Sequence, residues 1–107
     1  MINQNQNTNI EISYAELSKI VRENYDLKEV IQSYIDLDER ISPWFCPKCN
    51  QQDFEIMRNA KNGRLEYWCC FNCYNSAYDV IEFVAWIEGI DHHDAILKLA
   101  TQAGLLK

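Results

Sequence analysis

Two Cys-x-x-Cys pairs constrain this chain more than any other feature of its sequence. Cys46 and Cys49 form the first pair, and Cys70 and Cys73 form the second. A short turn of this kind delivers two sulfurs to one point, and two such turns separated by roughly 15–20 residues are typical of a zinc site. Four thiolates complete the tetrahedron that structural Zn²⁺ prefers. We therefore predict one structural zinc ion held by these four cysteines.

The fifth cysteine, Cys69, directly precedes Cys70, so the sequence offers two possible ligands at this point. Cys70 gives the regular two-residue spacing to Cys73, and alternation along a strand turns Cys69 to the opposite side. We expect Cys70 to bind the metal and Cys69 to be a small buried residue. A redox dithiol at residues 46–49 is the competing hypothesis, but such a motif opens a helix, whereas this one precedes a predicted strand.

The residues around the two pairs predict an α+β fold, in which a small zinc ribbon is flanked by two helices on each side. Residues 54–57 and 64–69 read as the two strands of a hairpin, and the Asn-Gly sequence at 62–63 suits a tight turn with positive φ. Four pairs of capping residues predict the helix starts. These pairs are Ser13 with Glu16, Asp26 with Glu29, Ser76 with Asp79, and Asp91 with Asp94.

Composition bounds the class of protein. Residues 1–11 are rich in Asn and Gln and predict a disordered tail, followed by a single domain over residues 12–107. No apolar run reaches the roughly 18–20 residues that span a bilayer. The N-terminus lacks the basic and apolar regions of a signal peptide. Clustered cysteines that bind metal are also typical of a reducing compartment, so we expect a cytoplasmic protein.

Charge is distributed unevenly along the chain. The net charge of −6 divides into −5 for residues 1–39, +2 for residues 40–75 and −3 for residues 76–107. Attraction to phosphate should therefore be confined to the ribbon. The candidate nucleic-acid contacts are Arg58, Lys61, Arg64, Tyr67 and Trp68. Each aromatic side chain could instead cover a face of the small sheet, and the sequence leaves both interpretations open.

Nothing in the sequence predicts an enzyme. There is no Gly-rich phosphate loop or nucleophile motif. Asp36, Asp38 and Glu39 are better explained as a solvated acidic turn. His92 and His93 lie far in sequence from the cysteines, and four thiolates already complete a tetrahedron, so we expect these histidines to have surface or capping roles.

Residues 27–105 resemble the N-terminal zinc-binding domain of bacterial and phage DNA primases. The similar segments are LKEVIQSYI at 27–35, CPKC at 46–49, WCCFNC at 68–73, DVIEFV at 79–84, EGI at 88–90 and AILKLA at 95–100. The family's aromatic-His-Cys-Phe-x-Cys motif also selects Cys70. This chain departs from the family at Cys49, where a His is usual, in the residues after the last ligand, and in shortened loops at 40–43 and 51–54.

The resemblance implies a free-standing zinc ribbon that binds single-stranded DNA or a primase or helicase partner, as a replication accessory encoded by a phage or other mobile element. The chain ends where a primase's catalytic domain would begin, so we expect that it cannot polymerise alone. The alternative is a protein-interaction module, an adaptor or inhibitor of replication or transcription machinery, which the acidic flanks favour. A zinc-ribbon transcription regulator is a third hypothesis, and it predicts a preference for duplex DNA.

Overall fold

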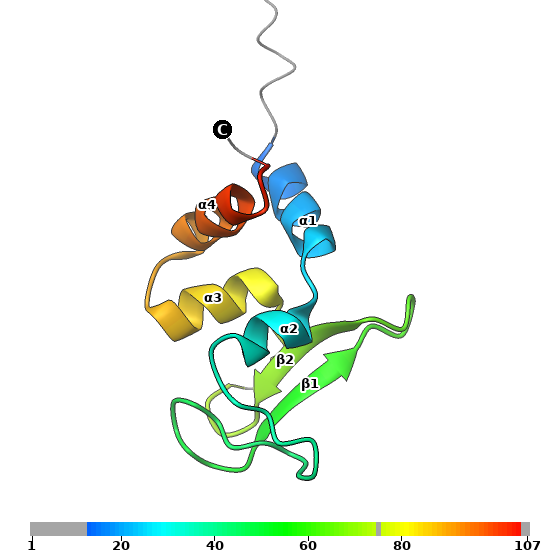
Figure 1. Cartoon of the computed structure of the whole chain (residues 1–107), viewed down its shortest axis with the longest axis vertical. Helices are drawn as coiled ribbons and strands as arrows, with labels where there is room; N and C mark the ends of the chain where they lie inside the picture. Colours follow the sequence, from blue (N-terminus) through cyan, green and yellow to red (C-terminus); the bar gives the residue numbers. More distant parts are fainter. Residues whose placement is uncertain (1–12, 75, 106–107) are drawn as a thin grey trace, which may run out of the picture.

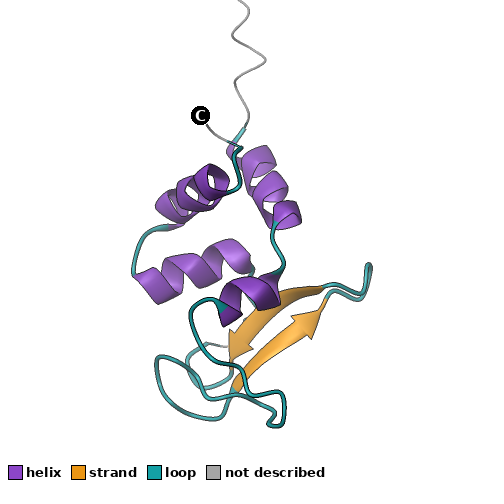
Figure 2. Ribbon diagram, in the orientation of Figure 1, coloured by secondary structure: helices purple, strands orange, loops and turns teal. Residues whose placement is uncertain are grey.

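The hairpin and helices follow one another in the predicted order. The computed structural model describes residues 13–74 and 76–105, so the predicted tail at 1–11 lies outside the described residues. The elements are α1 (Tyr14–Asn24), α2 (Leu27–Gln32), β1 (Phe54–Arg58), β2 (Leu65–Cys70), α3 (Val80–Glu88) and α4 (His92–Gln102). Figure 1 shows the helices gathered on one side of the hairpin, and Figure 2 separates helix from strand. The predicted α+β zinc ribbon is confirmed.

Three helices begin at the predicted cap residues. Ser13 and Glu16 form a reciprocal capping box at α1, and the side chains of Asp26 and Asp91 accept backbone N–H groups at α2 and α4. Gly89 ends α3 in the left-handed conformation, with φ of 71°. No helix within residues 13–74 and 76–105 is long and apolar enough to cross a membrane.

The start of α3 differs from the prediction. Asp79, and not Ser76, is the N-cap, and it forms a capping box with Glu82. The reason lies in Tyr78, whose backbone N–H and C=O both bond to Trp68 at 2.9 Å in an isolated β-bridge. Extended backbone at residue 78 excludes a helix that starts at 77.

Aromatic side chains pack the hairpin against α3. Phe54 and Trp68 project from the same face of the sheet and are 0% and 1% exposed. The Trp68 ring lies 5.6 Å from Phe83 and 4.8 Å from Trp86, measured between centroids. Its indole N–H donates to the Asp79 carbonyl at 2.8 Å, which satisfies the polar atom of a buried tryptophan. One cluster thus joins the ribbon to the helices.

The far end of the hairpin carries little of this packing. β1 and β2 are antiparallel, and their register shifts between Met57 and Arg58. Beyond the shift, Gly63 turns the chain with φ of 74°. Asn59 and Asn62 accept backbone N–H groups of the same turn at 2.8 and 2.9 Å. Figure 1 shows this end of the hairpin projecting away from the helices.

Candidate metal centre

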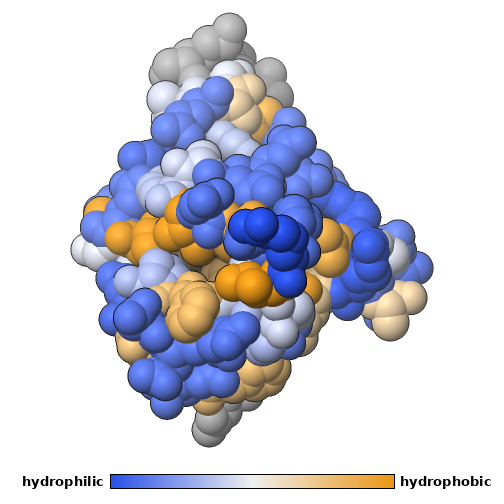
Figure 3. All heavy atoms as spheres, turned by 60° about the horizontal axis from the view of Figure 1, so that its bottom comes forward, coloured by the Kyte–Doolittle hydropathy of each residue, from blue (hydrophilic) through white to orange (hydrophobic). Residues whose placement is uncertain are grey.

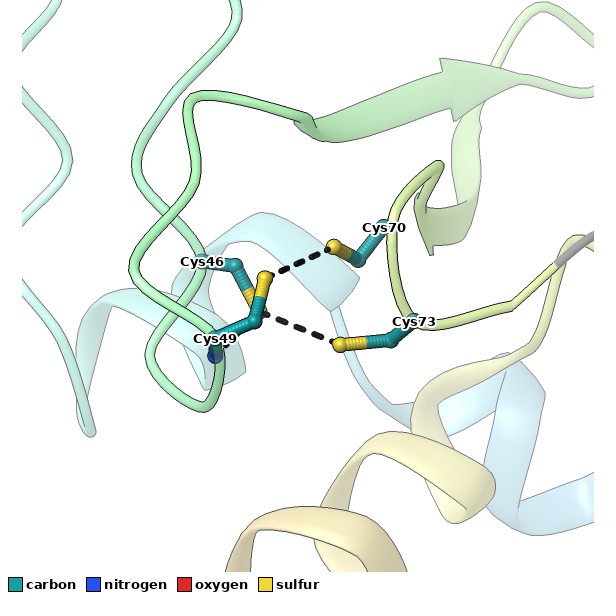
Figure 4. Close-up of side chains that lie close together, drawn as sticks. All are labelled: Cys46, Cys49, Cys70 and Cys73. Carbon is teal, nitrogen blue, oxygen red and sulfur yellow. Dashed lines mark hydrogen bonds between the residues drawn. The ribbon is translucent and has the colours of Figure 1, made fainter.

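The four predicted ligands meet at one point. Their Sγ atoms all lie within 4.8 Å of one another, although they come from two separate turns (Figure 4). The Sγ–Sγ distance is 3.8 Å between Cys46 and Cys73 and 3.6 Å between Cys49 and Cys70. A regular tetrahedron of sulfurs about 2.3 Å from zinc has edges of about 3.8 Å. Both the donor atoms and their spacing therefore fit zinc.

Backbone hydrogen bonds fold each cysteine turn. In the first turn the N–H of Asn50 donates to the Cys46 carbonyl at 2.9 Å, and Asn50 takes φ of 61°. Asn tolerates this left-handed conformation better than most residues. The N–H of Lys48 donates to the Cys46 sulfur at 3.3 Å, which favours a thiolate. The second turn repeats the backbone bond from Tyr74 to Cys70, also at 2.9 Å.

The thiols differ in their electrostatic surroundings. Burial raises the pKa of Cys73 and of Cys46. The N–H of Gln51 lowers the pKa of Cys49 to about 6. Thiolates are the form that binds metal, and four of them at this spacing need a compensating cation. Four sulfurs fill a tetrahedron without leaving a position for substrate, so the site is structural rather than catalytic.

Cys69 lies outside this cluster, as its place in the strand predicted. It is 4% exposed and pairs across the sheet with Glu55. Burial raises the pKa of its thiol. Cys70, the last residue of β2, contributes the fourth sulfur instead, as its two-residue spacing to Cys73 and the alternation along the strand together predicted.

The predicted nucleic-acid contacts do not all lie on the surface. Arg58, Lys61 and Arg64 are exposed at the projecting end of the hairpin, and Tyr67 is 37% exposed. Trp68 has to be removed from the set, because at 1% exposure it offers no ring face to a base. Its position in a small sheet that needs a covered face explains why packing takes precedence over binding.

One exposed aromatic residue precedes the first cysteine turn, and another lies within the second. Phe45 is 54% exposed and Phe71 is 59% exposed. Figure 3 brings the loop end of the molecule forward and shows apolar residues gathered in a band between hydrophilic ones. Phe45 was not among the predicted contacts, and nothing in the residues next to it distinguishes an exposed aromatic side chain from a buried one.

A second group of possible metal ligands occurs at the start of α4. Asp91, His93 and Asp94 lie close together and are all exposed. Asp91 is occupied as the helix N-cap. His92 shares a hydrogen bond of 2.5 Å with the Tyr14 hydroxyl. Within the group itself, the backbone N–H of Asp94 donates to the Asp91 side chain at 2.8 Å, and His93 Nδ1 lies 3.9 Å from an Asp94 oxygen, so the arrangement is explained as a helix cap.

The hairpin, the two cysteine turns and the closed tetrahedral site define a zinc ribbon. The chain belongs to the CHC2 zinc finger family, which matches residues 13–106. The DNA primase of Thermotoga maritima is 30% identical over 92 residues, which are 84% of this chain and 16% of that protein. The chain therefore spans about a sixth of the primase's length. No solved structure matches the chain.

These findings confirm the resemblance to primase zinc ribbons. The matched family is the zinc ribbon and not a catalytic primase domain. Cys49 occupies the position where the family usually has a histidine, and its sulfur lies in the cluster with the other three. The exchange keeps a zinc donor and adds one negative charge when the thiol is ionised.

Proposed function

We propose that this zinc ribbon binds single-stranded DNA as an accessory of DNA replication, with the projecting end of the hairpin as the contact surface. The observation that carries the proposal is the exposure of Arg58 and Lys61 at that end. Neither has an acidic partner within the described residues. Membership in a family that includes a DNA primase supports the same conclusion.

The three cationic side chains of the hairpin should contribute unequally to DNA binding. Arg58 donates to the Gly63 carbonyl at 2.7 Å, which fixes its side chain across the turn while its charge stays unpaired. Arg64 is paired with Glu66 at 3.3 Å and donates to the Tyr25 carbonyl at 3.2 Å. Phosphate would have to compete with these contacts. Arg58 and Lys61 are therefore the main phosphate contacts, and Arg64 is secondary.

Tyr67 supplies an aromatic surface beside these cations. Strand alternation turns it to the face opposite Trp68, and the amide of Asn59 lies 3.5 Å from its hydroxyl. A base stacked on an aromatic side chain typically contributes about 1–3 kcal/mol. The proposed surface thus combines phosphate contacts at the turn with one stacking position along β2.

Fluorescence anisotropy with labelled oligothymidylate, across a salt series, tests the proposal. Each phosphate contact adds about 0.7 to the slope of log affinity against log salt for single strands. The double variant Arg58→Ala, Lys61→Ala should lower that slope by about 1.4. Tyr67→Ala should weaken binding by about 1–3 kcal/mol. Lys98→Gln removes a charge on α4 and should leave the slope unchanged.

Two results would contradict the proposal. One is no detectable binding at low salt by the zinc-loaded chain, and the other is a double variant that keeps the full salt slope. A clear preference for duplex over single strands would favour a transcription regulator instead. Addition of the chain to a primase and helicase reaction then tests the replication role separately from DNA binding.

A further inference from the structure

An aromatic groove of about 330 Å³ lies between the second cysteine turn and α3, apart from the hairpin surface. The buried ring of Trp68 forms the floor of the groove. Three aromatic side chains and one carboxyl group form its sides, namely Tyr74, Tyr78, Trp86 and Glu82. Neither the zinc site nor the proposed DNA contact uses these side chains. Their arrangement indicates what kind of group could occupy the groove.

The rings meet at steep angles. Tyr74 and Tyr78 lie 5.1 Å apart between centroids with an interplanar angle of 73°, and Tyr74 and Trp86 lie 6.2 Å apart at 66°. A flat base stacks on a ring face or between parallel faces. A compact cation, in contrast, can contact several ring faces at once, as in the aromatic cages that bind ammonium groups. Tyr74 packs edge to face with Tyr78 and with Trp86, so these pairs offer no parallel faces between which a base could stack. A cation needs only the ring surface that these contacts leave open.

The chain itself shows that one of these rings accepts an ammonium group. The Nζ atom of Lys48 lies 5.5 Å from the centroid of the Trp86 ring. This distance is within the range of about 6 Å over which a cation is attracted to an aromatic face. Lys48 belongs to the first cysteine turn and is not among the described residues that line the groove, so this contact supports only the affinity of the Trp86 ring for a cation.

Glu82 gives the groove a negative group that forms no salt bridge among the described residues. The imidazole of His92 also lines the groove, and its interaction with Glu82 opposes the effect of burial on the pKa of Glu82. Its Oε1 accepts the backbone N–H of Asp79 at 3.0 Å, and burial raises its pKa. A cation beside this carboxyl would offset the cost of its burial. The net charge of −6 for the whole chain adds long-range attraction for a basic partner.

We propose that this groove docks a lysine or arginine side chain from a basic segment of a partner protein, held by the faces of Tyr74, Tyr78 and Trp86 and by the Glu82 carboxylate. DNA phosphate would meet a like charge at Glu82, so the groove is unsuited to nucleic acid. The hairpin and the groove would then serve different partners. This surface goes beyond the proposed DNA binding and does not depend on it.

Nuclear magnetic resonance titration of the zinc-loaded full chain tests the proposal. The probes are a capped Gly-Ser-Lys-Ser-Gly peptide, its trimethyllysine form, and a norleucine form that lacks the charge. Both cationic peptides should shift the Trp86 indole resonance, and the norleucine peptide should not. Glu82→Gln should weaken lysine binding about fivefold, as expected from loss of a partly buried charge pair. Glu23→Gln changes the net charge equally on α1 and should leave binding unchanged.

Three outcomes would overturn the proposal. In the first, the norleucine peptide shifts the same resonances as the lysine peptide. In the second, Glu82→Gln and Glu23→Gln bind the lysine peptide equally. In the third, oligothymidylate shifts the Trp86 indole and the lysine peptide does not, which would make the groove a base-binding site. Backbone resonances outside the groove report whether each variant remains folded.

Discussion

Replacing Cys69 and Cys70 in turn by alanine separates zinc binding from packing. The two residues are neighbours in β2, and both are buried, at 4% and 0% exposure. The same atoms are removed in each variant. Of these two residues, only Cys70 has its sulfur in the four-sulfur cluster. Any difference between the variants therefore reports what the cluster does.

The losses of folding stability expected for the two variants differ several-fold. Cys69→Ala deletes one buried heavy atom, and deletions of that size typically cost about 0.5–1.5 kcal/mol. Structural zinc contributes about 10–16 kcal/mol of apparent binding free energy in zinc-finger peptides. Loss of one ligand in four, shared equally, costs about 2.5–4 kcal/mol. Because the Cys70 position is 0% exposed, water cannot easily replace the missing sulfur, so this figure is a lower bound.

Elemental analysis and urea unfolding measure the two effects. We expect Cys69→Ala to keep one zinc per chain and to shift the urea midpoint by about 0.5 M, for a slope of about 2 kcal/mol/M. Cys70→Ala should lose zinc on dialysis against a chelator and unfold at a much lower midpoint. The reasoning fails if Cys69→Ala loses the metal while Cys70→Ala retains it, or if both variants keep it.

Three further predictions concern the helices. Gly89→Ala should destabilise the chain by about 1–2 kcal/mol in urea unfolding, because φ of 71° strains a residue with a Cβ although no atom lies within 4 Å of it. Asp79→Ala removes the α3 capping box and should cost about 1 kcal/mol, whereas Asp79→Asn should restore most of it. Burial and the nearby Glu88 raise the pKa of Tyr34 to about 12, so this hydroxyl stabilises the fold fully below a pH of about 10, and that contribution is lost as the pH rises through about 12. Absorbance titration of tyrosinate should show a late component that Tyr34→Phe removes and Glu88→Gln moves to lower pH; a late component that survives Tyr34→Phe would refute the assignment.

Local chemistry made most of the fold predictable. The ligand spacing identified the metal site, and the two-residue spacing to Cys73, together with alternation in β2, distinguished Cys70 from Cys69. Cap residues placed the starts of α1, α2 and α4 because a capping side chain acts within three residues of its own position. The caps depend on contacts that are close in sequence, and the metal site, although it joins two separate turns, is marked by the two-residue spacing within each turn.

Contacts between distant segments account for the misplaced features. Ser76 and Asp79 are both good cap residues, and only the bridge from Tyr78 to Trp68 decides between them. Trp68 has the residue type of a stacking platform, but its position opposite α3 makes it a core residue. The groove beside it could not be predicted either, because its sides come from a turn and a helix that meet only in the folded chain.

The burial of two zinc ligands also sets how quickly the metal can leave. Cys46 and Cys70 are 2% and 0% exposed, beneath the cluster that joins the hairpin to α3. A chelator in solution can reach the half-buried Cys49 and Cys73 but not these two sulfurs, so complete release has to wait for the hairpin to open away from the helix. Above a threshold chelator concentration, the rate of zinc loss should therefore stop rising and become equal to the opening rate. The limiting rate of zinc loss therefore measures the rate of local unfolding in this domain.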